Sequence, residues 1–230
     1  MKIVTWNCSL NFSKKFDLLN SLNADVMIIQ ECEKLESDFI LGYQLFWEGR
    51  NEKKGIAVIV RGSGSKKVEI DGSELAYFLP IETEWGLVLG VWAFNHRAKK
   101  FGLNISGYLV HALESYESII RENTRVIVAG DFNNGPKWDL IKFHKNNFRH
   151  IDEELARRSF SSSYHKKQNE VPGQESFSTY FHQRNPDMGY HIDYVYSKGF
   201  EVSELLVGEF IDWNMSSDHV PLYVVLKAKN

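Results

Sequence analysis

The feature that most restricts the fold of this chain is a series of short apolar runs, each about as long as one β-strand. Residues 26–29, 56–60 and 126–129 are unbroken runs of Val, Ile, Met and Ala, a pattern typical of strands buried on both faces. Further strands are expected where β-branched and aromatic residues gather between turn residues. The expected strands span residues 3–7, 25–30, 43–47, 56–61, 75–81, 87–94, 126–129, 176–181, 191–197, 200–207 and 220–226.

Helical spacing of apolar residues occurs in fewer places and always between expected strands. The stripe of Phe16, Leu18, Leu19 and Leu22 predicts one helix, and spacing over residues 109–120 predicts another. Pro136 marks the start of a third, which would continue through residues 138, 141 and 144. The serine-rich residues 157–175 are interpreted as a long surface loop. No repeat or linker interrupts residues 1–230, which favours a single α/β domain with a large β core.

Composition excludes several classes of protein. The 230 residues carry 30 acidic and 27 basic side chains, so binding of long nucleic acid through overall charge is disfavoured, although a local basic patch is not. Two cysteines are too few for a disulfide scaffold. The apolar runs are too short to span a membrane, and polar residues interrupt any N-terminal signal. We therefore expect a soluble, cytoplasmic protein with no membrane partner.

Polar side chains recur where the expected strands end. Ligand sites collect at strand ends because converging loops are held there by rigid strands. Oxygen-bearing side chains with one histidine suit Mg²⁺ or Mn²⁺ better than a thiolate-bound metal. The residues concerned are Asn7, Glu31, Asp131, Asn133, Asp193, Asp218 and His219.

Each of these residues also has a plainer interpretation. Glu31 could be the first solvated residue after a strand, and Asp131 could cap a helix before Pro136. Asp218 and His219 could form a turn. Asp193 is harder to explain in this way, because an acid inside an apolar strand is costly to bury without a partner.

Six short motifs occur in order along the chain: Thr5-Trp6-Asn7, Gln30-Glu31, Lys54-Gly55-Ile56-Ala57, Gly130-Asp131-Phe132-Asn133, His191-Ile192-Asp193-Tyr194 and Ser217-Asp218-His219-Val220-Pro221. Together they resemble the endonuclease/exonuclease/phosphatase superfamily of metal-dependent phosphoesterases, which includes exonuclease-III-like and DNase-like enzymes. The resemblance extends from residue 3 to residue 226. It implies a four-layer α-β-β-α sandwich of two packed, mostly antiparallel sheets flanked by helices.

The resemblance also implies a role for each matching residue. Glu31, Asn7 and Asp218 would hold Mg²⁺ or Mn²⁺, with Asn7 also close to a phosphate oxygen. Asp131 would orient or deprotonate the attacking water. Asn133 would fix that water or the phosphoryl oxygen. His219 would donate a charge-assisted hydrogen bond to the phosphoryl group, and Asp193 would set the tautomer of His219.

The chain departs from the family pattern at one strand. Trp92 stands where many nuclease and phosphodiesterase members carry a histidine that assists the leaving group. His96 and Tyr108 are candidate substrate-binding substitutes, and for both an ordinary structural role is the better interpretation. Two basic segments, residues 96–100 and 157–167, could be solvated surface or could form a lip around an anionic substrate.

These observations predict a Mg²⁺- or Mn²⁺-dependent phosphoesterase, a hydrolase of the nuclease or phosphodiesterase kind acting on DNA or nucleotides. Two alternatives stay open: a phosphatase acting on a small anionic substrate such as an inositol phosphate or nucleotide, and a catalytically silent binding module of the same fold. We expect a monomer. The sequence leaves endonuclease, exonuclease and phosphatase action undistinguished.

Overall fold

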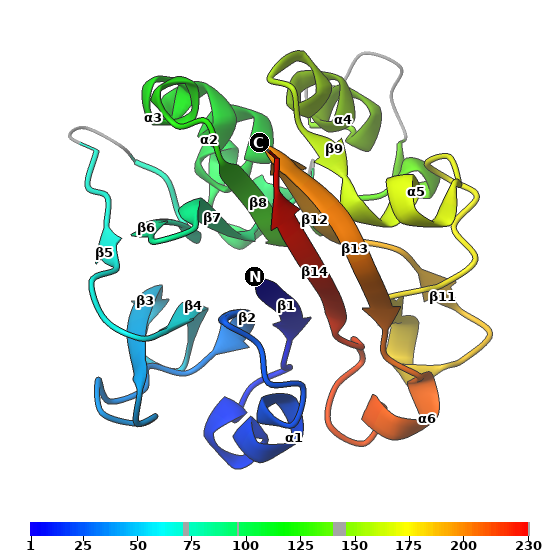
Figure 1. Ribbon diagram of the computed structural model, residues 1–230. Coiled ribbons are helices and arrows are strands. Elements are labelled where there is room, and N and C mark those ends of the chain that lie inside the picture. The colour runs from blue at the N-terminus through cyan, green and yellow to red at the C-terminus, as the bar shows by residue number, and fades with distance from the viewer. Residues whose placement is uncertain (71–73, 96, 140–145, 230) are drawn as a thin grey trace.

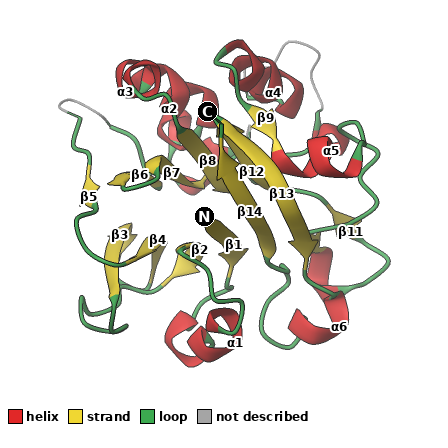
Figure 2. Ribbon diagram, viewed as in Figure 1, coloured by secondary structure: helices red, strands yellow, loops and turns green. Residues whose placement is uncertain are grey.

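Two six-stranded β-sheets form the centre of the computed structural model, which describes residues 1–70, 74–95, 97–139 and 146–229 (Figures 1 and 2). The first sheet has the order β13 (Phe200–Val207), β14 (Leu222–Ala228), β1 (Lys2–Asn7), β2 (Val26–Cys32), β4 (Lys54–Arg61) and β3 (Tyr43–Asn51). The second has the order β5 (Lys66–Lys67), β6 (Phe78–Thr83), β7 (Gly86–Trp92), β8 (Val126–Asp131), β12 (Asp193–Lys198) and β9 (Ser161–Ser162). A separate ribbon pairs β10 (Tyr180–Phe181) with β11 (Gly189–Tyr190).

Both sheets are mostly antiparallel. The pairs β1–β2 and β7–β8 are parallel, and the other neighbouring strands in the two sheets are antiparallel. Each parallel pair brings two strand ends to the same edge of its sheet. That edge is where the polar side chains singled out above lie.

Helices cover the outer faces of the sheets. In the view of Figure 1, α1 and α6 lie below the two sheets, α2, α3 and α4 lie above them, and α5 lies on the right, where it packs against β12 and β13. The helices are α1 (Phe16–Asn20), α2 (Leu109–Ser115), α3 (Glu117–Glu122), α4 (Phe148–Arg157), α5 (Ser163–Gln168) and α6 (Phe210–Trp213). Short 3₁₀ turns are η1 (Phe12–Lys14), η2 (Ala98–Phe101), η3 (Asn104–Gly107), η4 (Pro136–Trp138) and η5 (His182–Arg184).

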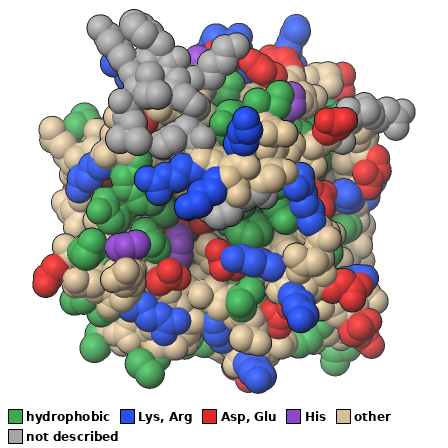
Figure 3. Space-filling model, turned by 180° about the vertical axis from the view of Figure 1, so that it is seen from behind, with side chains coloured by type: hydrophobic (Ala, Val, Ile, Leu, Met, Phe, Trp, Pro, Cys, Tyr) green, Lys and Arg blue, Asp and Glu red, His purple; other side chains and the backbone are tan. Residues whose placement is uncertain are grey.

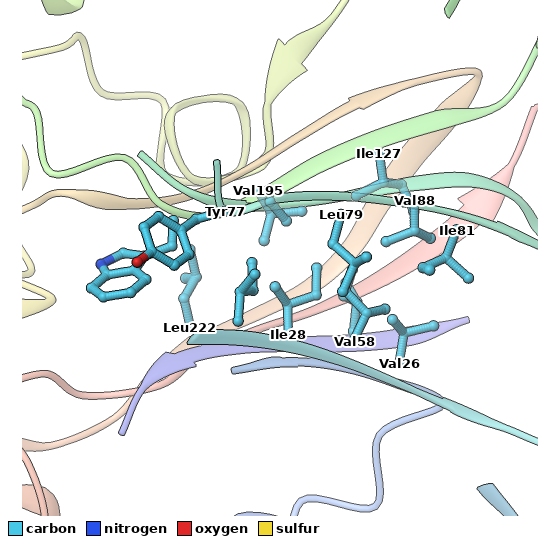
Figure 4. Packing of buried hydrophobic residues seen from close by; sticks show 14 of the residues in the cluster. Val26, Ile28, Val58, Tyr77, Leu79, Ile81, Val88, Ile127, Val195 and Leu222 are labelled. Atoms are coloured by element: carbon cyan, nitrogen blue, oxygen red, sulfur yellow. The ribbon is translucent and has the colours of Figure 1, made fainter. Parts of the chain in front are cut away.

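Three apolar layers hold these elements together. Between the sheets, Ile28 and Val58 of the first sheet point toward Leu79 and Val88 of the second (Figure 4). A second cluster joins β8 to α2, α3 and α4, and a third joins the first sheet to α1 and α6. The expected four-layer α-β-β-α sandwich of two mostly antiparallel sheets is confirmed.

Glycine is required at the end of β8, directly before Asp131. Gly130 has φ +148°, and a Cβ added there would collide with the carbonyl oxygen of Val91 on β7. Residues other than glycine rarely adopt that backbone conformation. The glycine therefore lets β7 and β8 lie close together where the strands reach the polar edge.

The interpretation of residues 157–175 as a surface loop is wrong. This segment contains β9 and α5, and Ser163, Tyr164 and His165 are buried. The Ser162 hydroxyl caps α5 by accepting the His165 N–H, and the Tyr164 hydroxyl donates to Glu170. Polar side chains that satisfy one another can be buried at little cost, and a composition-based prediction does not detect that.

Other boundaries differ from expectation in smaller ways. The helical residues 109–120 form two helices that meet at Tyr116, and α4 was not expected at all. Pro136 begins only the turn η4, and the predicted continuation through residues 141 and 144 lies outside the described residues. The expected strand over residues 176–181 shortens to β10. No helix within the described ranges is long and apolar enough to cross a membrane.

Candidate active site

A cleft of about 800 Å³ opens at the edge of the sandwich where β1, β2 and β8 end. Six of the seven predicted site residues line it, and the seventh, Asp193, lies fully buried directly behind His219. The sandwich therefore brings together side chains that are up to 212 positions apart in the sequence. The six lining residues are Asn7, Glu31, Asp131, Asn133, Asp218 and His219.

Asp131 is the most completely fixed of these side chains. It is fully buried at the end of β8. Its Oδ1 accepts the backbone N–H of Asn133 at 2.7 Å, and its Oδ2 accepts from the side-chain amides of Asn7 at 3.0 Å and Asn133 at 3.1 Å. These bonds leave the carboxylate little freedom to rotate, which is the condition for aiming it at a reacting group.

His219 is held on the other side by Asp193. The Nδ1 of His219 lies 2.8 Å from Oδ2 of Asp193, and both side chains are buried. The backbone around them is fixed by two hydroxyls. The Thr179 hydroxyl accepts the N–H of Asp193, and the Ser217 hydroxyl accepts the N–H of His219 while donating to the carbonyl of Asn7.

The charges of this cluster shift the pKa values of its members. Burial alone would lower the pKa of His219, but the charge and hydrogen bond of Asp193, with Asp131 and Asp218, raise it to about 10. Burial and the charge of Asp193 raise the pKa of Asp131 above its ordinary value, although His219 and Asn7 act in the opposite direction. The arrangement thus favours an imidazolium that can donate beside a carboxylate that can accept a proton.

Two residues in left-handed conformations turn their side chains into the cleft. Glu31 has φ +56° at an irregularity in the pairing of β2 with β4, between Gln30 and Cys32. Asn133 has φ +48°, two residues after the end of β8. Non-glycine residues with positive φ are uncommon and often occur at functional positions.

The donor atoms fit a hard divalent cation. Ligand atoms of Asp131, Asp193 and His219 lie within 4.8 Å of one another, but Asp193 and His219 bond to each other, which leaves the oxygen donors of Asn7, Glu31, Asp131 and Asp218 facing the cleft. Within the described ranges, the Oδ1 atom of Asp193 is buried and has no hydrogen-bond partner. Carboxylate oxygens without strong thiolate donors are the ligand set that Mg²⁺ and Mn²⁺ prefer.

Aromatic side chains form both sides of the cleft. On one side, the Tyr77 and Trp92 rings lie 4.7 Å apart and the Trp92 and Phe94 rings 5.3 Å apart. On the other, Trp138 contacts Tyr190 at 5.2 Å. Tyr180 joins this second group and lies 4.8 Å from the His219 ring. Among the described residues, the Lys and Arg side chains that line the cleft are Lys54, Arg97 and Lys137.

The structure does not place the remaining sequence candidates at the cleft. His96 is outside the described residues. Tyr108 precedes α2, packs against the inter-sheet core and is not among the residues that line the cleft. In the basic segment 157–167, Arg158 pairs with Glu117 and Glu154, and His165 contacts Glu175, so the expected lip over the cleft is not formed by these two side chains.

The most informative comparison is with protein-family models. The model of the endonuclease/exonuclease/phosphatase family matches residues 4–219. The chain belongs to this family. A search of curated protein sequences finds no significant match.

Solved structures with the same fold include several nucleic-acid enzymes. The 3′ phosphatase NExo from Neisseria, bound to a product DNA hairpin, matches with a TM-score of 0.74 and 18% identity over 99% of each chain. An AP endonuclease from Archaeoglobus fulgidus matches with a TM-score of 0.71 and 16% identity over 99% of this chain and 100% of that one. The APE2 catalytic domain from Xenopus laevis matches with a TM-score of 0.69 and 16% identity over 100% of this chain and 92% of that one.

Three contributors to the site were not found from the sequence. Thr179 supports Asp193 through its hydroxyl, and Tyr180 and Trp138 form part of one aromatic side. Thr179 and Tyr180 lie within the expected strand over residues 176–181, but the strand pattern gave no reason to place either side chain at the site. The family motifs pointed to the polar floor of the cleft and not to its sides.

Proposed function

We propose that this protein is a divalent-metal-dependent phosphodiesterase that hydrolyses DNA or other nucleotide-containing substrates by in-line attack of a water molecule. The observation that carries the proposal is the buried cluster of Asp131, Asp193 and His219 at the base of the cleft. Phosphate esters are anionic and repel a nucleophile, so their hydrolysis requires both charge neutralisation and an aligned water. A fixed carboxylate beside a stable imidazolium is suited to both tasks.

Each side chain then has a role that follows from its contacts. Asp131 orients the attacking water and accepts its proton, because its carboxylate is buried, fixed and raised in pKa. Asn133 is held against Asp131 and positions the water or a phosphoryl oxygen. His219 donates from Nε2 to the phosphoryl group, since Asp193 occupies Nδ1.

Asn7, Glu31 and Asp218 are the residues we propose for holding Mg²⁺ or Mn²⁺. All three line the cleft on the side of the first sheet. A bound divalent cation supplies Lewis acidity and lowers the pKa of water. The chain's own contribution is to fix these oxygen donors: Asn7 donates to Asp131, and the left-handed backbone at Glu31 directs that side chain inward.

The aromatic sides of the cleft favour a nucleotide-containing substrate. A base stacked on an aromatic side chain contributes about 1–3 kcal/mol to binding. Trp138 and Tyr190 offer such surfaces next to the acidic floor. On the face of the molecule seen in Figure 3, Lys and Arg side chains are scattered among acidic and apolar ones. Recognition inside the cleft is therefore favoured over attraction by a broad basic surface on that face.

The alternatives are less well supported. A pocket closed by residues 157–175 with their basic side chains pointing inward would favour a phosphatase for small anions, but Arg158 and His165 are paired with acids elsewhere. A silent binding module would not need the complete set of polar residues that the cleft retains.

The proposal is tested with a panel of labelled substrates. Intact duplex, duplex with one abasic site, single strand and a 3′-phosphorylated strand are each incubated with wild type and with Asp131→Asn, in Mg²⁺ or in chelator. Cleavage of an internal or terminal diester that needs both Mg²⁺ and Asp131 supports the proposal. If no diester is cleaved, nucleotides and inositol phosphates are tested next. Release of phosphate alone, or turnover of these small molecules only, would contradict the phosphodiesterase proposal and support the phosphatase.

A further inference from the structure

Lys54 places an ammonium group in the cleft, and the roles proposed above do not use it. It is the first residue of β4, and its ammonium lies 2.9 Å from a carboxylate oxygen of Glu31 on β2. The same ammonium lies 5.2 Å from the centre of the Trp92 ring, which belongs to β7 of the second sheet. Lys54 therefore reaches from one sheet across to the other over the mouth of the cleft.

The strand register locates this cation relative to Asp131. Trp92 on β7 and Asp193 on β12 are the two strand partners of Asp131 on β8. Residues paired in register across neighbouring strands project from the same face of a sheet. The carboxylate of Asp131 is thus flanked on one side by Trp92, with Lys54 over its ring, and on the other by Asp193, which holds His219.

The contacts of Lys54 leave donor capacity facing the cleft. An ammonium has three N–H donors, and among the described residues Glu31 is the acid within ion-pair distance of it. The Lys54 side chain is 39% exposed. An ion pair this exposed contributes little to stability, so folding alone gives a weak reason for a lysine here.

Trp92 contacts the Lys54 ammonium through its ring and carries no charge that would neutralise it. Only 4% of Trp92 is exposed, and its ring packs on those of Tyr77 and Phe94. A cation is attracted to the face of an indole ring, and the N–H groups that point away from the ring remain available to an anion. The ammonium is therefore held in position without being neutralised from that side.

We propose that Lys54 is a phosphate-binding residue of this site: its ammonium contacts a non-bridging oxygen of the substrate phosphate on the side of Asp131 opposite His219. A phosphate over Asp131 then has a cationic donor on each side. This inference rests on the proposed function for the identity of the anion as a phosphoester, and the test below separates the two.

The test measures binding instead of turnover. The inactive Asp131→Asn protein and its double variants with Lys54→Met, Lys54→Arg or Lys53→Met are titrated with a fluorescein-labelled single-stranded oligonucleotide, and separately with inorganic phosphate. Lys53 is exposed and adjacent in sequence but does not line the cleft, so Lys53→Met removes the same charge as a matched control.

The proposal predicts that Lys54→Met weakens oligonucleotide binding about tenfold, the size expected for a lost hydrogen bond to a charged group. Lys54→Arg restores most of the affinity, and Lys53→Met changes it less than twofold. The loss occurs in chelator as well as in Mg²⁺. The loss of affinity also persists in a Glu31→Gln background. There, removing the Lys54 ammonium leaves no unpaired carboxylate at position 31 that could repel the oligonucleotide.

Two results would overturn the proposal. Binding of both probes within twofold of the parent in Lys54→Met would remove Lys54 from the phosphate site. A loss that disappears in the Glu31→Gln background would mean that Lys54 only compensates Glu31. If the wild type hydrolyses no phosphoester but phosphate binding still depends on Lys54, the proposed function fails and the phosphate site remains.

Discussion

Replacing Glu175 with Gln tests whether the segment leading into the site depends on one buried carboxylate. The side chain of Glu175 is only 5% exposed, and its Oε1 accepts the Gly173 N–H at 2.8 Å and lies 3.1 Å from Nε2 of His165. These bonds hold residues 163–176, which lead directly to Thr179 and the support of Asp193. We expect Glu175→Gln to loosen this segment.

The magnitude follows from the pKa of the carboxyl group. Burial alone would raise the pKa of Glu175, but its hydrogen bonds with His165 and Gly173 lower it from 4.5 to about 2. That difference corresponds to about 3 kcal/mol of stabilisation for the charged form, at 1.36 kcal/mol for each pH unit. Because Gln keeps one acceptor oxygen, we expect the free energy of unfolding to fall by about 2 kcal/mol at pH 7.

The pH dependence has a definite sign. A carboxyl group whose pKa is lower in the folded state stabilises the protein fully above its unfolded pKa and loses that effect as pH falls toward its folded pKa. For Glu175 the window runs from pH 4.5 down to about 2. The difference between wild type and Glu175→Gln should therefore shrink on acidification, to roughly half at pH 3.

Urea unfolding followed by tryptophan fluorescence, at pH 7 and in steps down to pH 3, measures this difference directly. Glu36→Gln serves as the matched control, because Glu36 is exposed, and it should change stability by less than about 0.5 kcal/mol. The reasoning is refuted if Glu175→Gln is as harmless as the control at pH 7, or if its cost stays constant on acidification.

Two further predictions concern the cleft. His219→Ala should lower kcat by about a hundredfold or more while changing substrate affinity much less, because its hydrogen bond strengthens as charge develops in the transition state; an equal loss in kcat and affinity, measured by steady-state kinetics and direct binding, would assign it to ground-state binding. Trp138→Ala should raise the KM for a single-stranded oligonucleotide about tenfold with kcat and thermal stability nearly unchanged, because one stacking surface is lost; an unchanged KM would remove Trp138 from the substrate path.

Local patterns in the sequence predicted a single α/β domain with buried strands and polar side chains at strand ends, whereas the four-layer sandwich was predicted only from the resemblance of six motifs to a known family. Unbroken apolar runs such as residues 126–129 indicate buried strands, and Asp131 and Glu31 stand at strand ends, where topology brings side chains together. The structure confirms the sandwich of two sheets flanked by helices. The catalytic and metal-binding roles of these residues remain predictions that the experiments above address.

The sides of the cleft could not be predicted in the same way. Tyr180 reaches His219 through the fold of a segment whose regular structure is limited to a two-residue strand, and Lys54 reaches Trp92 from a different sheet. Such contacts depend on the packing of distant elements and leave no periodic signal. Buried pairs of polar side chains also leave no signal in the sequence. For that reason the segment that contains His165 and Glu175 was predicted to be a surface loop.

The central claim is that the cluster around Asp131 is a metal-dependent hydrolytic centre. The most direct test compares the rates at which wild type and Asp131→Asn hydrolyse the panel ester that wild type cleaves fastest, in Mg²⁺ and in EDTA, with melting temperatures measured in parallel. We predict a loss of about a thousandfold for Asp131→Asn, a melting temperature close to that of wild type, and no turnover in EDTA. Hydrolysis by Asp131→Asn at a rate near that of wild type, or hydrolysis that continues in EDTA, would contradict the account.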